Sequence, residues 1–565
     1  MTTIMAMDRS RKHVLRLCAV RRSGIIRAFP NSRKLATSSA APCKRRLSGA
    51  RTPRLPWMML RPIFRILRGG RRELRNYNIV WICSDQQRWD TLQCLGFKGT
   101  QTPNIDRLAA RGTVFARAYS QSPICTPSRT SFLTGMYPIA HQVHQNGAGT
   151  FPPHLVLLPK LMANAGYYTG HIGKLHLSAT RQMIERRPDD GYNEFYWSPE
   201  PFPEWSGDHD YHAWLWDKGV NPETYYKPYQ DQHYGPGPAA EYRQVRWAGD
   251  RAERFIEMHS ERSWYLAINI DAPHPPLNPP EDYLRRFNPA DMPDPAFKPI
   301  DLEHQKKFEK VDQQAKSAVD PWRAEQDVGE AHTDELAGPT HEAPPTSFNI
   351  WEMRAAYHAE VAQVDDLVGR ILDVLKETGQ LDRTIIVFIS DHGDMMGDHG
   401  LLYKGCRFYE GVVHVPLIIS VPGSPVHGLV SNALVELVDI APTLLSLSGL
   451  DVPKAMQGLS LDQMLRGNTS LDNHKSFVVS EYYNSLRFRG SRGSRASMYY
   501  DGRHKLNVYH DVGIGELFDH QEDPNEHHDL WDSAHHRELK ARLLESSFSA
   551  MMLRSGSGPA RIEDY

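Results

Sequence analysis

The chain has 565 residues, of which 40% are hydrophobic and 24% charged, a composition typical of a globular protein. This length exceeds the size at which one hydrophobic core stops growing, so we expect one large domain and a smaller one. No apolar run approaches the roughly 20 residues that a membrane helix needs. We therefore expect no membrane span.

The formal net charge of −1 hides an uneven distribution. Residues 1–75 hold 20 of the 66 Lys and Arg residues but only two acids, Asp8 and Glu73, which leaves 46 basic and 65 acidic side chains in the rest. That remainder carries a net charge of −19, so we expect it to bind no nucleic acid.

Three hypotheses stay open for the basic segment 1–75: a transit peptide, an arm for nucleic acid or anionic membranes, and a start placed too far upstream. We favour a disordered extension or an overlong start, with Met58 or Met59 as the initiator.

Cysteine usage and the N-terminus bear on the compartment. The six cysteines are too few and too scattered for a disulfide framework, at positions 18, 43, 83, 94, 125 and 406. No continuous apolar segment precedes a small-residue cleavage site, as a secretory signal would require. The sequence therefore predicts a reducing, cytoplasmic location.

Strand and helix patterns alternate in the first part of the chain. Near-continuous apolar runs at 78–84, 264–270 and 384–390 predict strands buried on both faces of a parallel sheet. A short helix is expected from Pro103, and apolar residues at helical spacing predict another across 361–375. This alternation predicts an α/β fold with a large, mainly parallel sheet and helices on both faces.

Two insertions interrupt this pattern. Segment 185–247 is dense in Trp, Tyr and Pro, and its aromatic side chains either line a substrate pocket or pack on one another. Segment 300–348 is polar and predicts a long, partly flexible excursion or a lid. Shorter strand patterns follow, so we predict a catalytic domain at 76–465 and a small antiparallel subdomain at 466–565.

Polar side chains follow each of the three predicted strands. Asp85 and Gln86 end the first strand, His274 follows the second, and Asp391 and His392 end the third. Ligand sites in open α/β sheets lie at these carboxyl ends. Either aspartate alone would be read as a helix N-cap, but two converging carboxylates repel one another unless a cation lies between them. The pattern therefore predicts a divalent metal site.

The segment 123–135 reads Pro-Ile-Cys-Thr-Pro-Ser-Arg-Thr-Ser-Phe-Leu-Thr-Gly. A lone cysteine such as Cys125 is often only a buried small hydrophobe. Every position here, however, resembles the Cys-x-Pro-x-Arg signature of the type I sulfatases, members of the alkaline phosphatase superfamily. The segment 166–176, with Lys174 and His176, resembles the second signature of that family. The resemblance extends from about residue 76 to 555.

The resemblance implies the fold and the cofactors. It implies an alkaline phosphatase-like sheet, and a maturation enzyme that converts Cys125 to formylglycine, whose hydrated aldehyde is the nucleophile. It also implies one divalent metal held by Asp85, Gln86, Asp391, His392 and an oxygen of the modified Cys125. Ca²⁺ is the leading candidate. Many family members have an acid in place of Gln86 and Asn in place of His392, which keeps Mn²⁺ and Mg²⁺ open as alternatives.

By the same resemblance, Arg129 orients the hydrate and His176 assists the breakdown of the sulfated intermediate. Lys174 and Lys404 neutralise the oxygens of the sulfate ester, and His274 is the general acid for the leaving alcohol. Asn146 either donates a hydrogen bond to a substrate oxygen or is simply a turn residue before glycine.

The leading hypothesis is therefore hydrolysis of a sulfate monoester of a small molecule or a saccharide. The first alternative is a phosphonate monoester or phosphodiester hydrolase of the same superfamily. Lys174 and His176 favour sulfate, because the phosphonate branch carries uncharged hydroxyl residues in their place. The second alternative is a catalytically silent binding protein, which would be expected to have lost Cys125, Lys404 or a metal ligand. The oligomeric state stays open.

Overall fold

The computed structural model describes residues 77–180, 183–201, 209–229, 232–309, 311–313, 318–324, 345, 347–485 and 493–556. The predicted basic extension 1–75 and much of the predicted excursion 300–348 lie outside these residues. Within them, no helix combines the length and the apolar character that crossing a membrane requires.

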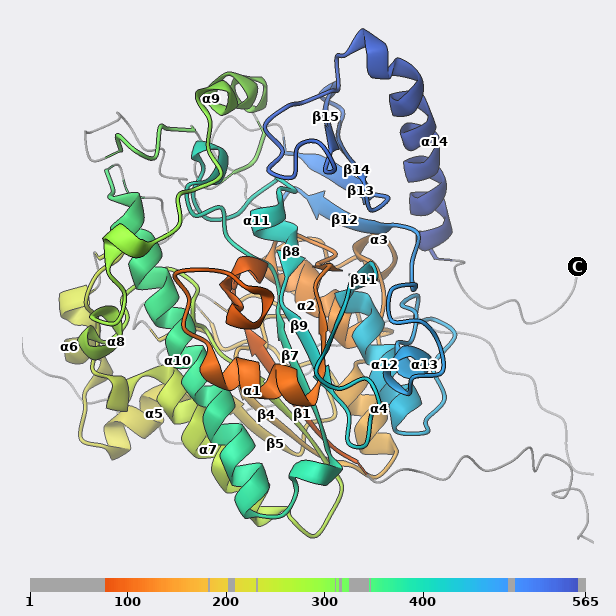
Figure 1. The fold of residues 1–565 in the computed structure, drawn as a ribbon. Helices are drawn as coiled ribbons and strands as arrows, with labels where there is room; N and C mark the ends of the chain where they lie inside the picture. The colour runs from red at the N-terminus through yellow and green to blue at the C-terminus, as the bar shows by residue number, and fades with distance from the viewer. Residues whose placement is uncertain are drawn as a thin grey trace, which may run out of the picture. The chain divides into compact units, whose positions relative to one another are not determined.

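An eight-stranded sheet forms the centre of the large domain (Figure 1). Its middle strands β7, β1, β6, β4 and β5 are parallel, and β9 runs antiparallel to both β7 and β2. In spatial order the strands are β10 (Leu429–Ser431), β2 (Thr113–Phe115), β9 (Leu417–Ser420), β7 (Thr384–Ser390), β1 (Asn78–Ser84), β6 (Trp264–Asn269), β4 (Tyr168–Gly173) and β5 (Glu194–Trp197).

Helices cover both faces of this sheet (Figure 1). In β1, Ile79 and Trp81 belong to one apolar core, while Val80 and Ile82 belong to the core on the opposite face, which explains why a strand buried on both sides reads as a continuous apolar run. The first face carries α2 (Cys125–Thr134), α4 (Leu158–Asn164), α12 (Ile440–Leu447) and α13 (Asp462–Leu465). The second carries α1 (Pro103–Arg111), α5 (Asp210–Asp217), α7 (Gln244–Met258) and α10 (Ile350–Glu377).

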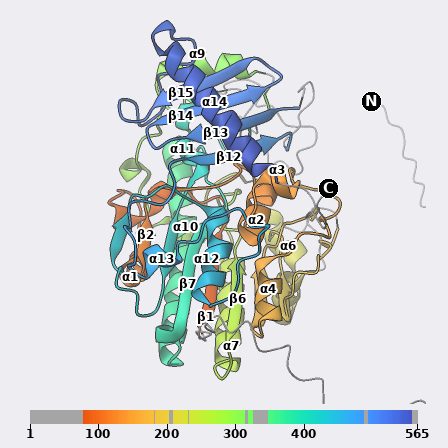
Figure 2. The same cartoon turned by 90° about the vertical axis from the view of Figure 1, so that its right-hand side faces the viewer.

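A separate four-stranded antiparallel sheet follows in the C-terminal part. Its core includes Val479, Leu506 and Leu517, against which Leu543 and Ala550 of a long helix pack. Figure 2 shows that helix, α14, lying across the strands. The elements are β12 (Val478–Tyr483), β13 (Arg495–Tyr500), β14 (His504–His510), β15 (Ile514–Asp519) and α14 (Arg537–Arg554).

The predicted fold class is confirmed: a mixed, mainly parallel sheet with helices on both faces, and a small antiparallel sheet. The predicted strand 384–390 has the predicted bounds, and 264–270 ends one residue earlier. Part of the aromatic segment 185–247 packs into the main core. It contributes β5 to the main sheet, and Tyr211, Trp214 and Tyr226 are buried in the core.

Candidate active site

Cys125 is the first residue of α2, a helix whose ten residues are all buried. The chain enters the helix through the extended Ile124 and leaves it at Gly135, which takes a left-handed conformation. The amide of Thr126, in the first turn, donates to Asn146 Oδ1 at 3.0 Å. Because the N-terminus of a helix favours negative charge, this placement stabilises an anionic group at position 125.

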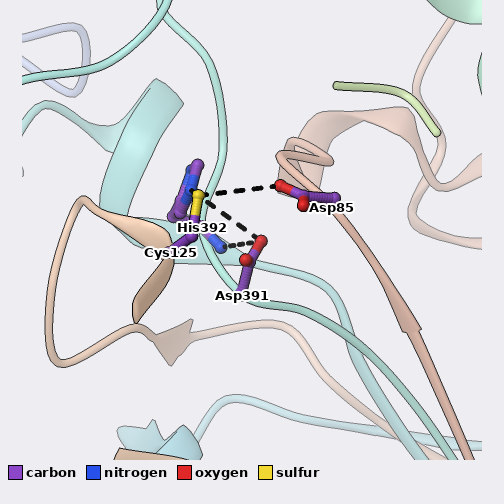
Figure 3. Close-up of side chains that lie close together, drawn as sticks. All are labelled: Asp85, Cys125, Asp391 and His392. Atoms are coloured by element: carbon purple, nitrogen blue, oxygen red, sulfur yellow. Dashed lines mark hydrogen bonds and ion pairs between the residues drawn. The ribbon is translucent and has the colours of Figure 1, made fainter. Parts of the chain in front are cut away.

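Four buried side chains converge at the carboxyl edge of the sheet, and Figure 3 shows them facing one another. The ligand atoms of Asp85, Cys125, Asp391 and His392 all lie within 4.8 Å of each other. Cys125 Sγ is 3.1 Å from His392 Nε2 and 3.9 Å from Asp85 Oδ1. Asp85 follows β1 and Asp391 follows β7, so the parallel pairing of these strands brings the two carboxylates together.

Arg129, one turn along α2 from Cys125, bridges the two carboxylates. Its Nε lies 2.9 Å from Asp391 Oδ2 and its Nη2 lies 3.2 Å from Asp85 Oδ2. Burial alone would raise the pKa of Asp85, but Lys174 and Arg129 hold that pKa well below its usual range. Both carboxylates are thus oriented by a guanidinium that is itself only 1% exposed.

Lys174 lies directly after β4, where that strand meets β6. A Cβ on Gly173 would lie 1.8 Å from Asn269 O, so only glycine allows this close approach. Lys174 Nζ contacts Asp85 Oδ2 at 2.6 Å and Glu200 Oε1 at 3.1 Å. Burial would lower the pKa of Lys174, but these carboxylates raise it, so Lys174 stays charged.

His274 reaches the same edge from the end of β6. Its Nδ1 lies 2.7 Å from Pro275 O and 4.0 Å from Glu200 Oε1. Burial, Lys404 and Lys174 lower the pKa of His274 well below its usual value. His274 also lines a cavity with Glu200 and Asp271, so its imidazole borders a space at the edge of the site.

Lys404 and Gln86 complete the inner layer of the site. Lys404 Nζ lies 3.1 Å from Cys125 Sγ and 2.7 Å from Gln86 Oε1. Gln86 Nε2 donates to Asp394 Oδ2 at 2.5 Å. Burial would raise the pKa of the Cys125 thiol, but Lys404 holds it well below its usual value.

The remaining two predicted residues, His176 and Asn146, lie beside this group. His176 has a left-handed backbone, with φ of 55°, and its amide donates to Glu185 Oε2 at 2.9 Å. The side-chain oxygen of Asn146 is occupied by the Thr126 amide, so at least this atom supports α2. The structure thus brings all eleven predicted site residues into one region.

Three further residues hold this arrangement, and none of them was predicted as a site residue. Asp394 fixes the amide of Gln86, Glu200 neutralises Lys174, and Glu185 accepts the amides of the loop that carries His176. Asp394 could have been suspected, since it follows the Asp391–His392 pair. Glu200 lies in the aromatic segment, where nothing distinguished it from a surface acid.

The donor set fits a divalent cation. Asp85 and Asp391 supply hard oxygen atoms, and His392 supplies an imidazole nitrogen. Gln86 Oε1 lies near the same group, because it accepts from Lys404 Nζ, which also contacts Cys125 Sγ. Two fully buried carboxylates so close together need compensating positive charge, and a bound cation would add to the charge of Lys174 and Arg129.

A buried cysteine at a helix N-terminus, candidate metal ligands at strand ends and two buried lysines are groups suited to the hydrolysis of an anionic ester, on a sheet of the alkaline phosphatase fold. The sequence comparison then gives the family. The sulfatase family matches residues 77–450, and the C-terminal domain of N-sulphoglucosamine sulphohydrolase matches residues 397–551. The chain belongs to the sulfatase family and is an enzyme of sulfate ester hydrolysis.

Individual relatives agree with this family. The chain is 28% identical to an arylsulfatase of Clostridium perfringens over 82% of this chain and 91% of the relative. It is 27% identical to the N-acetylglucosamine-6-O-sulfatase of Bacteroides thetaiotaomicron, over 84% and 86%. Among solved structures, the phosphonate monoester hydrolase SpPMH of Silicibacter pomeroyi is 26% identical with a TM-score of 0.69, covering 85% of this chain and 96% of that one.

Proposed function

We propose that the protein cleaves a sulfate monoester of a small alcohol or saccharide with formylglycine, derived from Cys125 by a maturation enzyme, as the nucleophile. One observation carries this proposal: Cys125 Sγ lies between His392 Nε2 and Lys404 Nζ, at 3.1 Å from each. In this position the sulfur stands in for an oxygen of the hydrated aldehyde. The N-acetylglucosamine-6-O-sulfatase among the relatives supports a saccharide substrate.

Asp85, Gln86, Asp391 and His392 would hold one divalent metal, for which Ca²⁺ is the leading candidate and Mn²⁺ or Mg²⁺ the alternatives. When present, the aldehyde hydrate supplies an attacking hydroxyl and a second hydroxyl, and the cation neutralises the anionic ester. The remaining chemistry belongs to the side chains of the chain itself.

Lys174 and Lys404 bind the sulfate oxygens and stabilise the charge that develops on them. Lys404 Nζ already contacts the nucleophile position, so it can hold a substrate oxygen beside the attacking group. Arg129 keeps both carboxylates in place, and His176 would assist the release of sulfate.

His274 delivers a proton to the leaving oxygen. Its Nδ1 is engaged with Pro275 O, which leaves Nε2 as the atom that faces the substrate. Such a step contributes roughly 10²–10⁴-fold to the rate. Binding of an anionic ester beside the imidazole opposes the lysines that lower its pKa and so favours the protonated form.

A phosphonate monoester hydrolase is the second candidate, and the similarity to SpPMH supports it. The two activities are separated by assaying an aryl sulfate and phenyl phosphonate at equal concentrations with the same preparation. We expect a higher kcat/KM for the sulfate, because Lys174 and His176 are both retained. A large preference for the phosphonate would reverse the assignment.

The nucleophile is tested on the Cys125 peptide. Tryptic mass spectrometry should give the mass of formylglycine or its hydrate, and Cys125→Ala should abolish turnover of the aryl sulfate while the fold is kept. Cys406→Ala, at another fully buried cysteine, is the matched control and should stay active. Unmodified cysteine in fully active protein, or turnover by Cys125→Ala, would rule out the proposed nucleophile.

A further inference from the structure

A second group of buried ligand-type side chains lies outside the active site. It consists of Asp301, His399 and His527, which are 1%, 3% and 3% exposed. Their ligand atoms lie within 4.8 Å of one another. The group joins three distant segments: α9 (Pro299–Gln305), the loop after β7, and the C-terminal part beyond β15.

Both imidazoles turn the same nitrogen towards one carboxylate. His527 Nδ1 lies 3.1 Å from Asp301 Oδ1 and 3.0 Å from Oδ2, and His399 Nδ1 lies 3.5 Å from Oδ1. The His399 separation is longer than an ordinary N–H···O hydrogen bond of about 2.7–3.2 Å. Ligand atoms on one tetrahedral zinc, with bonds near 2.0–2.1 Å, lie about 3.3 Å apart. The observed spacing therefore suits shared coordination.

The surroundings hold these groups in place. Asp301 Oδ2 also accepts the Lys298 amide at 2.8 Å, whereas Oδ1 is the oxygen that both histidines approach within 3.5 Å. His399 adopts a left-handed backbone with φ of 52°, a conformation that costs free energy for any residue but glycine. Its ring also stacks on Tyr409, with centroids 3.8 Å apart. Backbone strain and stacking together fix the imidazole towards the carboxylate.

We propose that Asp301, His399 and His527 form a second, structural metal site for a divalent transition ion of the zinc type. Two imidazoles and a carboxylate are ligands that zinc binds, and a water molecule would complete its four positions. The bound ion ties the loop that carries Asp391, His392 and Lys404 to α9 and to the C-terminal part. This site is independent of the proposed sulfatase chemistry.

A hydrogen-bonded His–Asp–His group without metal is the competing explanation, and metal analysis separates the two. The full-length protein is expressed with added zinc and dialysed into metal-free buffer. Its zinc content per chain is then measured by elemental mass spectrometry. We expect about one zinc ion per chain at this site. His527→Gln should lose that ion, whereas the control His474→Gln, at a histidine paired with Asp439, should keep it.

A second variant, changed in the active site, tests whether the zinc is bound there instead. Asp85→Asn should keep the zinc that His527→Gln loses. If His527→Gln does not fold, the zinc X-ray absorption spectrum of the Asp85→Asn protein replaces it, and two imidazole ligands are expected. Equal zinc in the wild type and in folded His527→Gln, or a spectrum without imidazole, would overturn the proposal.

Discussion

The orientation of the Gln86 side chain depends on Asp394, a neighbour with no proposed role in the chemistry. An amide side chain can present either its oxygen or its NH₂ to the site. Asp394 decides between them, because its buried carboxylate accepts from Gln86 Nε2 at 2.5 Å, which turns Oε1 towards Lys404 at 2.7 Å. The backbone of Gln86 is also held in a left-handed conformation, with φ of 67°. Asp394 is therefore a positioning residue for a proposed metal ligand.

Asp394→Asn should reverse the amide of Gln86. The new NH₂ group faces the NH₂ of Gln86, so the glutamine rotates and presents a donor to the cation. Loss of an outer partner of a metal ligand typically costs 10–100-fold in metal affinity or activity. We expect kcat/KM to fall by about that factor at limiting metal and to recover partly as the metal concentration rises.

The control for this variant is Asp472→Asn, at an acid near the surface that accepts the amide of Asn432. It should leave the metal dependence unchanged. Wild-type activity of Asp394→Asn at limiting metal would show that the Asp394 contact does not position Gln86.

The sequence predicted the side chains that are proposed to carry out the chemistry, but not the side chains that hold them in position. Asp85, Asp391 and His274 were predictable because each follows an apolar strand, and parallel strands end at one edge. Asp394 and Glu200 gave no such signal, because their importance rests on contacts with Gln86 and Lys174 that exist only in the folded chain.

Among the helices and strands, the same physical reason decides which ones the sequence predicts and which it does not. Buried strands such as β1 and β7 show as apolar runs. The helix α2 has all ten residues buried, including Thr126, Ser128 and Arg129, so it has no polar face and no helical period to detect. Its position was predictable only through the family signature. The edge strand β5 is mostly half-buried and reads as part of the aromatic segment.

The strand β12 carries a carboxyl group that folding keeps from ionising. Glu481 is 1% exposed, and burial raises its pKa to about 8. Its Oε2 accepts from Tyr483 at 2.8 Å. In the unfolded chain the pKa of a glutamate is about 4.3, so between these two values the folded state binds more protons than the unfolded state. Stability is therefore lost as pH rises from about 4.3 to 8.

Glu481→Gln should remove this pH dependence, because glutamine keeps the shape and the acceptor but has no charge to bury. We expect the variant to have a higher Tm than the wild type at pH 8.5, by several degrees, and a similar Tm at pH 4.5. Thermal unfolding followed by circular dichroism at both pH values measures the difference. Glu538→Gln, on α14, is the control. A gain that is equal at both pH values would contradict burial of the charge as the cause.

At the scale of the whole molecule, the small sheet supports the loop that carries Lys404. Cys406 and Phe408 pack in one apolar core with Val478 and Met498 of the small sheet. A buried ion network reinforces this contact. Lys505 of β14 is fully buried.

The ammonium of Lys505 lies 2.7 Å from both Glu410 Oε1 and Glu526 Oε1. Burial would raise the pKa of Glu410, but Lys505 holds it well below its usual value. One cation therefore joins Glu410, which precedes β9 of the main sheet in the chain, to the C-terminal sheet.

Lys505→Met should test whether the two sheets form one cooperative unit. Removing the ammonium leaves two carboxylates in a buried site without their cation, a change that typically costs about 3–5 kcal/mol. The loss should be largest near pH 7.5 and should shrink towards pH 4, where both acids become protonated in the variant, since it lacks the ammonium that keeps them ionised.

Urea unfolding followed by tryptophan fluorescence and by far-UV circular dichroism provides the measurement. Both signals should shift together to lower urea, because a network that spans the two sheets couples their unfolding. The control Lys306→Met removes a lysine from an exposed pair with Glu303, where such contacts contribute about 0.2–1 kcal/mol. A comparable small loss in Lys505→Met, or two separate transitions in the wild type, would mean that the small sheet folds independently and that the loop carrying Lys404 is held without it.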